Sequence, residues 1–71
     1  MSDSKIQVKV GIQIQKIREL KGLSQQDLAA KCNFEKSNMS RLEAGKVNPT
    51  LSTLEKVATA LEINIIELFN F

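Results

Sequence analysis

Short segments with apolar residues at helical spacing, each followed by a residue that ends a helix, constrain this chain more than any other feature. Gly22, Asn33 and Gly45 follow the first three segments, and such residues accept the left-handed backbone that closes a helix. No pair of strands with a hairpin turn competes with this pattern, so we predict an all-α bundle of five short helices. The predicted helices span residues 12–21, 24–32, 35–44, 51–61 and 65–69.

The first ten residues fit two patterns. Apolar residues alternate with polar ones from Ile6 to Val10, which is typical of a strand, but the same residues also continue one helical face. Gly11 interrupts either pattern. We therefore treat residues 1–10 as a flexible arm or a short strand, ahead of a folded domain that spans residues 11–71.

Composition excludes most catalytic and metal chemistry. The 71 residues make one domain, with no histidine and a single cysteine, Cys32. A zinc site needs several Cys or His ligands, a disulfide needs two cysteines, and His-based catalytic pairs need a histidine. The 8 acidic residues are scattered, and so small a domain has little room for a deep substrate pocket. We expect no enzyme activity, no metal site, no cofactor and no small-molecule ligand.

Neither a membrane span nor a signal peptide is recognisable in the sequence. No stretch approaches the roughly 20 apolar residues that cross a bilayer. The segment from Met1 to Lys5 lacks the basic and then apolar build of a secretion signal. A free cysteine without such a signal fits a reducing compartment, so we expect a cytoplasmic protein with no membrane partner.

The net charge of +2 is a weak hint of a polyanionic partner, and its distribution says more. Residues 1–23 carry +3, residues 24–50 carry +1 and residues 51–71 carry −2. Phosphates would be repelled by the acidic C-terminal third. A nucleic acid should therefore meet the first two thirds of the chain.

Residues 24–45 predict a specific arrangement of two helices. Ser24 is a favourable N-cap, and Asp27 places a carboxylate in the first turn, where the helix dipole favours it. After the turn at Asn33, the second helix keeps its polar residues on one side. Two short helices around a tight turn, the second with a polar outer face, are typical of a helix-turn-helix motif, whose second helix enters the DNA major groove.

Short motifs run through almost the whole chain, from about Val10 to Phe69. They are Gly11-x-x-Ile14-x-x-Ile17-Arg18, Lys21-Gly22-Leu23-Ser24-Gln25-x-x-Leu28-Ala29, Met39-Ser40-Arg41-Leu42-Glu43-x-Gly45, Asn48-Pro49-x-Leu51 and Leu54-x-x-Val57-Ala58-x-Ala60-Leu61. Together they resemble the Cro and phage-repressor helix-turn-helix family. The resemblance implies a lambda-repressor-like DNA-binding domain that regulates transcription.

The resemblance also implies contacts with the DNA backbone. Family members bind a phosphate with the glutamine after the N-cap, here Gln25, and the N–H groups at a helix N-terminus form a ready phosphate site. We expect Ser24 and Gln25 to bind a phosphate there. Lys46 and Asn48, in the loop after the second motif helix, are expected to contact the sugar-phosphate backbone.

By the same resemblance, the outer face of the helix at residues 35–44 reads the bases. Lys36, Ser37 and Arg41 are the predicted readers, since Arg and Lys can address guanine and Ser can bond to several bases. The flanking candidates are Glu35, Asn38 and Ser40. An ordinary solvated face is the alternative interpretation, and only the motif context favours base reading.

Arg18 and Glu43 match an arginine and a glutamate that family members pair between the first helix and the recognition helix. Such a pair orients helices more than it stabilises them, because desolvation offsets most of the attraction. We therefore assign Arg18 to an internal salt bridge and not to the DNA contacts.

Two residues depart from the family pattern at helix ends. Asn33 and Glu62 stand where glycine is usual. Asparagine tolerates the left-handed conformation, whereas glutamate would be strained in it. We therefore expect the link after the fourth helix to be built differently.

The C-terminal tail is too apolar to remain fully exposed to water. We expect Ile63, Ile66 and either Leu68 or Phe69 to close the core, and the rest of the tail to form a symmetric homodimer interface, as the C-terminal helix of the family commonly does. The residues assigned to that interface are Ile65, Phe69 and Phe71. A two-fold dimer would set two recognition helices about one DNA turn (~34 Å) apart, on a palindromic operator.

The predicted function is sequence-specific regulation of transcription through double-stranded DNA, with repression as the expected effect. An antitoxin or a restriction-modification controller would use the same fold, and the sequence does not separate them. The alternative from another class is an adaptor that binds proteins and not DNA. An adaptor should have acidic or apolar residues at the positions that Lys36, Ser37 and Arg41 occupy here.

Overall fold

A computed structural model describes the backbone of residues 2–71 and the side chains of residues 6–71. All regular secondary structure in this part of the chain is helical, which confirms the predicted all-α class. The elements are α1 (Ser2–Leu20), α2 (Gln25–Cys32), α3 (Lys36–Glu43), α4 (Leu51–Leu61) and a 3-10 helix, η1 (Ile65–Phe69).

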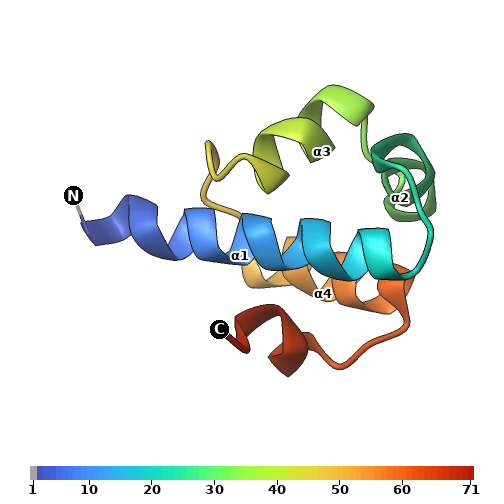
Figure 1. Ribbon diagram of the computed structural model, residues 1–71. Helices are drawn as coiled ribbons and strands as arrows, with labels where there is room; N and C mark the ends of the chain where they lie inside the picture. The colour runs from blue at the N-terminus through green and yellow to red at the C-terminus, as the bar shows by residue number, and fades with distance from the viewer. Residues whose placement is uncertain (1) are drawn as a thin grey trace.

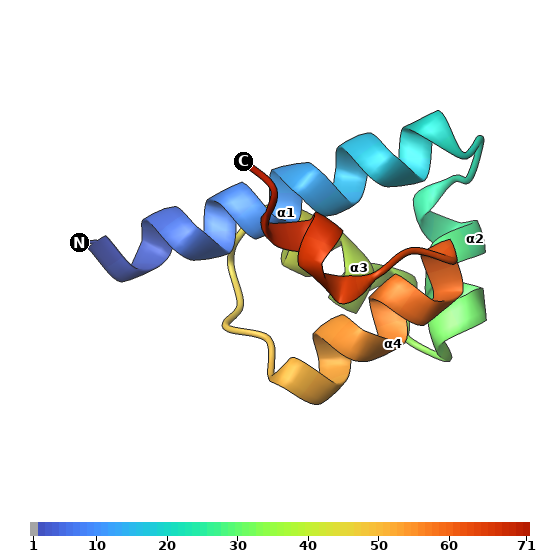
Figure 2. The same cartoon turned by 90° about the horizontal axis from the view of Figure 1, so that it is seen from below.

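Helix α1 lies at the centre of the fold and packs against α3, α4 and η1. Figure 1 shows it running through the middle of the molecule, with α2 and α3 on one side and the C-terminal segment on the other. Figure 2, seen from below, shows that segment lying between α1 and α4. Contacts join α3 to both α1 and α2, α4 to α1 and α2, and η1 to α1 and α4. The α2–α3 hairpin and the tail therefore lie on different sides of α1.

The strand or arm predicted for residues 1–10 is corrected by the structure, because α1 begins at Ser2 and runs through them. Met1 and the side chains of the first five residues lie outside the described part. Val10 and Ile14 are buried together, one helical turn apart. Packing of this helical face against the core overrides the strand-like alternation that precedes it.

Gly11 lies inside α1 and allows α1 to approach α3 closely, although in the sequence it looks like an interruption. A Cβ atom at this position would lie 2.5 Å from the backbone oxygen of Glu43 and 2.7 Å from that of Leu42. Any side chain would push α1 away from the end of α3. The close contact offsets the low helix propensity of glycine.

The fifth element also differs from the prediction, since η1 is a 3-10 helix and a bundle of five α-helices is not confirmed. The side chain of its N-cap, Asn64, accepts a hydrogen bond from the backbone N–H of Ile66, and Glu67 accepts one from that of Asn64. A segment of 5 residues gains too few hydrogen bonds to offset the cost of starting an α-helix. The tighter 3-10 turn is usual at this length.

The hydrophobic core draws on the inward faces of the four α-helices and on one residue of η1. Its buried members are Val10, Ile14, Leu28, Ala29, Cys32, Met39, Leu42, Leu54, Val57, Ala58, Leu61 and Leu68. Burial raises the pKa of the Cys32 thiol, so this residue behaves as a small hydrophobic side chain and not as a nucleophile.

Each of the four α-helices is followed, within two residues, by a residue with a left-handed backbone. Gly22 and Gly45 each have a φ of 74°, Asn33 has 60° and Glu62 has 61°. After α4, the N–H groups of Glu62 and Ile63 bond to carbonyls of the last helical turn, each at 3.0 Å. The link after α4 is therefore of the ordinary kind, and the expectation that it would differ is wrong. Glu62 adopts the conformation normally left to glycine and bears its strain.

The tail buries part of the set predicted for the core: Leu68 and, in part, Ile63 are confirmed there, and Ile66 is not. Leu68 is fully buried and Ile65 is half-buried against the core, whereas Ile66 is 70% exposed. Residues three apart lie on the same side of a 3-10 helix, so Ile65 and Leu68 point inward together. The assignment of Ile66 to the core is therefore wrong, and Phe69, three residues after it, is exposed as well.

Candidate nucleic-acid interface

A buried ion pair between α1 and α3 lies beneath the polar face of the α2–α3 hairpin. Arg18 and Glu43 are 7% and 5% exposed. The guanidinium donates from Nε to Oε2 at 2.7 Å and from Nη2 to Oε1 at 3.0 Å, and its Nη1 donates to the carbonyl of Leu23 at 2.8 Å. The hydrogen bond to Glu43 raises the pKa of Arg18. This bidentate pair fixes the angle between α1 and α3 and ties down the segment that precedes α2.

Gln25, which we expected to bind a phosphate, joins this buried network. Its Nε2 donates to Oε1 of Glu43 at 2.9 Å, and its side chain is half-buried. No local pattern in the sequence indicates this contact, because the two residues are far apart in the chain. The bond links the first turn of α2 to the last turn of α3.

The N-terminus of α2 is closed by a capping box. The hydroxyl of Ser24 accepts from the N–H of Asp27, and the Asp27 carboxylate accepts from the N–H of Ser24, both at 3.0 Å. These hydrogen bonds lower the pKa of Asp27. The first N–H groups of a helix have no acceptor inside it, so those of Gln25 and Gln26 remain for an anion.

All the predicted base-reading residues and flanking candidates are exposed, at the N-cap and along α3. They are Glu35, Lys36, Ser37, Asn38, Ser40 and Arg41. The helical period puts Ser37 and Arg41 opposite the buried side of α3, with Lys36 and Asn38 on the two flanks. Arg41 donates to Asn38 at 3.4 Å, a long bond that leaves most guanidinium donors free.

Ala44 belongs to the same face but was not among the predicted readers. It is the exposed C-cap residue of α3, seven residues after Ser37 and three after Arg41. This spacing puts the three on one side of the helix. A small methyl group in such a place can contact the methyl group of thymine.

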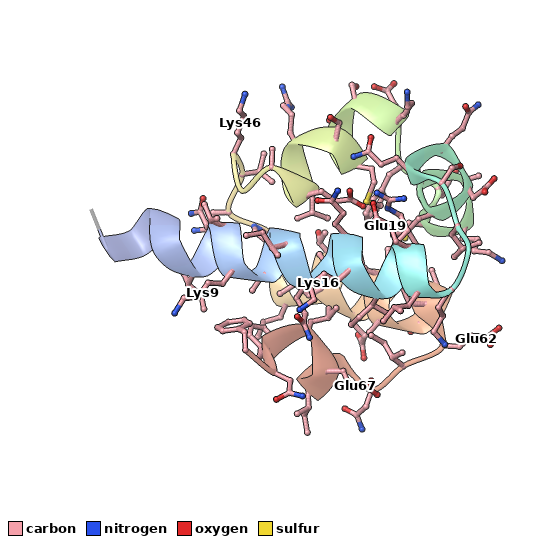
Figure 3. The ribbon with its side chains drawn as sticks, viewed as in Figure 1. Lys9, Lys16, Glu19, Lys46, Glu62 and Glu67 are labelled. Carbon is pink, nitrogen blue, oxygen red and sulfur yellow. The ribbon has the colours of Figure 1, made fainter. Side chains whose placement is uncertain are left out.

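Lys46 extends this polar surface beyond the end of α3. Figure 3 shows its side chain pointing away from α1, on the side of the molecule where α3 lies. Asn48, two residues on in the same loop, is exposed as well. Both residues are thus available to a partner that approaches α3.

Two lysines of α1, Lys9 and Lys16, do not share this face. Lys9 and Lys16 lie on the side of α1 away from α3, as do the acidic residues Glu62 and Glu67 (Figure 3). The charges of these two lysines therefore add little to the α3 surface. We expected a nucleic acid to meet the first two thirds of the chain. For Lys9 and Lys16 this expectation is wrong, because they lie away from the α3 surface.

Other kinds of site find little support in the part of the chain that the structure describes. There, no cluster of His, Cys, Asp and Glu side chains could hold a metal ion, and no helix is both long and apolar enough to span a bilayer. What the fold brings together is a capped helix, a tight turn at Asn33 and a second helix whose polar side is open. These features define a helix-turn-helix DNA-binding domain.

Comparison with known proteins agrees with this class. A family model described as helix-turn-helix matches residues 14–68. An uncharacterised HTH-type transcriptional regulator of Sinorhizobium fredii, y4dJ, is 39% identical over 83% of this chain and 77% of its own length. The immunity repressor of Bacillus phage phi105 is 45% identical over 79% of this chain, which spans only 39% of that longer protein.

A solved structure matches over the full length of its chain. The restriction-modification controller protein C.AhdI from Aeromonas hydrophila superposes with a TM-score of 0.87 at 38% identity, over 97% of this chain and 100% of the controller. The chain therefore belongs to the helix-turn-helix family of DNA-binding transcriptional regulators.

Proposed function

We propose that this protein regulates transcription as a homodimer on a palindromic site in duplex DNA, with α3 of each copy in the major groove. Lys36, Ser37 and Arg41 read base edges, and Glu35, Asn38 and Ser40 flank them. The sugar-phosphate backbone of the DNA is contacted by Ser24, Gln25, Lys46 and Asn48. Phosphate contacts fix the register of the protein on DNA, while base contacts supply the specificity.

The observation that carries this proposal is the open polar face of α3 above a buried ion pair. Hydrogen bonds to bases are directional, so a reading helix must be held at one angle. The bidentate pair between Arg18 and Glu43 provides that support. An adaptor for a protein partner would need no positively charged residue at Arg41, which stands at the middle of this face.

A second copy fits the surface formed by the starts of α1 and α4 and by η1 better than the α3 face. A groove there has an apolar side made by Ile6, Val10, Leu51, Leu54 and Phe69, and Gln7, Asn48 and Pro49 complete its lining. Ile66 and Phe69, three residues apart on η1, share one exposed side. In a two-fold dimer the same surface supplies both the groove and the side chains that enter it.

Among the residues first assigned to the dimer interface, Phe69 and Phe71 are exposed and Ile65 is not. Ile66 therefore takes the place of Ile65 in this proposal. We define the apolar end as the exposed side chains of Ile6, Leu51, Ile66, Phe69 and Phe71.

The function of a restriction-modification controller is a specific form of this proposal. The match to C.AhdI covers that whole protein, whereas the match to the phage repressor covers less than half of it. The controller is therefore matched more completely than the repressor. Genes for a nuclease and a methyltransferase beside this gene would support the controller, and a toxin gene would support an antitoxin.

Selection of bound sites from a random DNA pool, followed by titration of two variants, tests the proposal. Arg41→Ala should lose about 1–3 kcal/mol of binding free energy on the selected site and relax specificity at one base position. Lys46→Ala should weaken binding to selected and random DNA alike and lower the salt slope by about one. If the affinity for duplex DNA did not change with salt concentration, the proposed binding to phosphates would be wrong. If both variants weakened binding to both DNAs equally, Arg41 would not be a base reader distinct from the backbone contact Lys46.

A further inference from the structure

The second turn of α1 contacts the loop that carries the proposed backbone contacts. The side-chain amide of Gln7 faces the carbonyl oxygens of Gly45 and Val47. With its nitrogen turned toward them, it donates to Gly45 at 3.3 Å and to Val47 at 3.1 Å. Carbonyl oxygens only accept hydrogen bonds, so this is the orientation that satisfies all three groups.

The neighbouring residue of α1 contacts the same loop by packing. A Cβ atom on Gly45 would lie 2.7 Å from the Cα and Cγ2 atoms of Val8. The backbone of the loop is thus pressed against α1 at the point where α3 ends. Gln7 and Val8 hold it from two adjacent positions, by hydrogen bonds and by contact.

In the part of the chain that the structure describes, backbone hydrogen bonds hold only the two ends of this loop, and at its middle the half-buried side chain of Val47 packs against the core. In residues 2–71, its backbone–backbone hydrogen bonds lie at its two ends, from the N–H of Lys46 to Arg41 and from the N–H of Leu54 to Thr50. The carbonyls that Gln7 reaches flank Lys46 on both sides. Without Gln7 the loop would be more mobile. Lys46 would then lose more conformational entropy on binding a phosphate than it does on the loop held by Gln7.

We propose that Gln7 is a positioning residue for DNA binding, which holds the loop of Lys46 and Asn48 in the conformation that meets the sugar-phosphate backbone. This proposal rests on the proposed function. Gln7 itself touches no DNA in this arrangement. It acts through the loop, so its removal changes how Lys46 and Asn48 bind and leaves base reading by α3 intact.

The test compares Gln7→Leu with Gln15→Leu, which removes an amide from an exposed part of the same helix. Gln7→Leu should weaken binding to the selected site and to random duplex DNA about fivefold each, the order expected for one weakened contact. The salt slope of binding should fall by up to about one, because a phosphate contact is weakened. Gln15→Leu should change neither quantity. A loss of overall stability alone would leave the salt slope unchanged, so thermal unfolding of each variant is followed in parallel. Gln7 also lines the groove of the proposed dimer interface, so sedimentation equilibrium of each variant must show an unchanged dimer dissociation constant.

A double-mutant cycle shows whether Gln7 acts through the loop. When Lys46 and Asn48 are already alanine, adding Gln7→Leu should change DNA affinity by less than about twofold. The full effect in that background would overturn the proposal, and so would wild-type affinity and salt slope in the single variant. In both cases the wild-type protein would still bind DNA, and the proposed function would stand. Absence of salt-dependent DNA binding by the wild-type protein would overturn both.

Discussion

The α2–α3 hairpin and the apolar end are two outward surfaces of one small domain, and they differ both in chemistry and in support. The outer face of the hairpin is polar, and the buried ion pair between Arg18 and Glu43 lies beneath it. The apolar end is hydrophobic, and its tail is tied to α1 by Gln13, whose Nε2 donates to the carbonyls of Glu67 at 2.9 Å and Asn70 at 3.3 Å.

This difference follows from what each surface recognises in the proposed function. Hydrogen bonds to DNA need donors at set positions and angles, so the hairpin is held by a rigid, directional pair. Hydrophobic contact with a second copy is not directional and scales with buried area. A short 3-10 helix that presents apolar side chains is sufficient for it.

The largest expected effect comes from breaking the support beneath the hairpin. Arg18→Met leaves the Glu43 carboxylate buried without its cation and should lower the free energy of unfolding by about 3–5 kcal/mol. A small domain has about 5–15 kcal/mol in total, so much of its stability would be lost. The chain has no Trp or Tyr, so urea unfolding is best followed by circular dichroism.

The double variant Arg18→Met/Glu43→Met provides the control, because it removes both charges. It should recover most of the lost stability while DNA affinity stays low, since the pair orients α3 and contributes little net stability. A double variant that is no more stable than the single one would contradict the role of the unpaired carboxylate.

A smaller effect is expected where α1 meets the end of α3. Gly11→Ala raises helix propensity, which alone would add about 1 kcal/mol of stability. The new Cβ would instead meet the backbone of Glu43 at 2.5 Å, and forcing the helices apart should cost about 1–3 kcal/mol. We expect a net loss of stability in urea unfolding. Gln15→Ala, on the exposed face of α1, is the control and should be slightly stabilised by helix propensity alone. A Gly11→Ala variant that is stabilised in the same way would contradict the steric role of the contact with α3.

At the apolar end, Ile66→Ser should change assembly and not folding. Ile66 is 70% exposed, so the stability of the monomer should hardly move. The dimer dissociation constant should rise about tenfold or more in sedimentation equilibrium, because a buried Ile contributes at least about 1.5 kcal/mol. Leu20→Ser is the matched control, since Leu20 is 85% exposed but lies outside the apolar end. Equal effects of the two changes would contradict the proposed interface.

The smallest expected effect concerns two helix ends, one in the hairpin and one before the tail. Glu62→Gly should raise the free energy of unfolding by about 1 kcal/mol, because glycine relieves the strain of a positive φ. Asn33→Gly should gain less, since asparagine already tolerates this conformation. Thermal unfolding would compare the two, and a larger gain at Asn33 would be the opposite of this expectation.

Local signals in the sequence were sufficient for most of the hairpin. Ser24 with Asp27 at the start of α2, the turn at Asn33 and Gly45 after α3 each act within a few residues, and the structure contains all of them. Helical spacing indicated the exposed row around Ser37 and Arg41. For Gln25 we favoured a phosphate contact over a simple place in the capping turn, and its bond to Glu43 could not be foreseen, because it joins helices that only packing brings together.

The N-terminal segment and the tail were harder to predict for the same reason. Apolar residues before Gly11 fit a strand or a helix equally well, and contact with the core favours the helix. The tail has six apolar residues, and local spacing does not say which of them enter the core; the 3-10 geometry buries Leu68 fully and Ile65 in part.

The sequence by itself therefore determined the helical class, the helix-turn-helix motif and the polar face of α3, because periodicity and capping operate over one or two turns. Tertiary structure alone decided how closely α1 approaches α3 at Gly11, how Gln25 joins the buried pair and which isoleucine of the tail faces outward. These depend on distances between residues far apart in the chain, which are set only when the whole core packs.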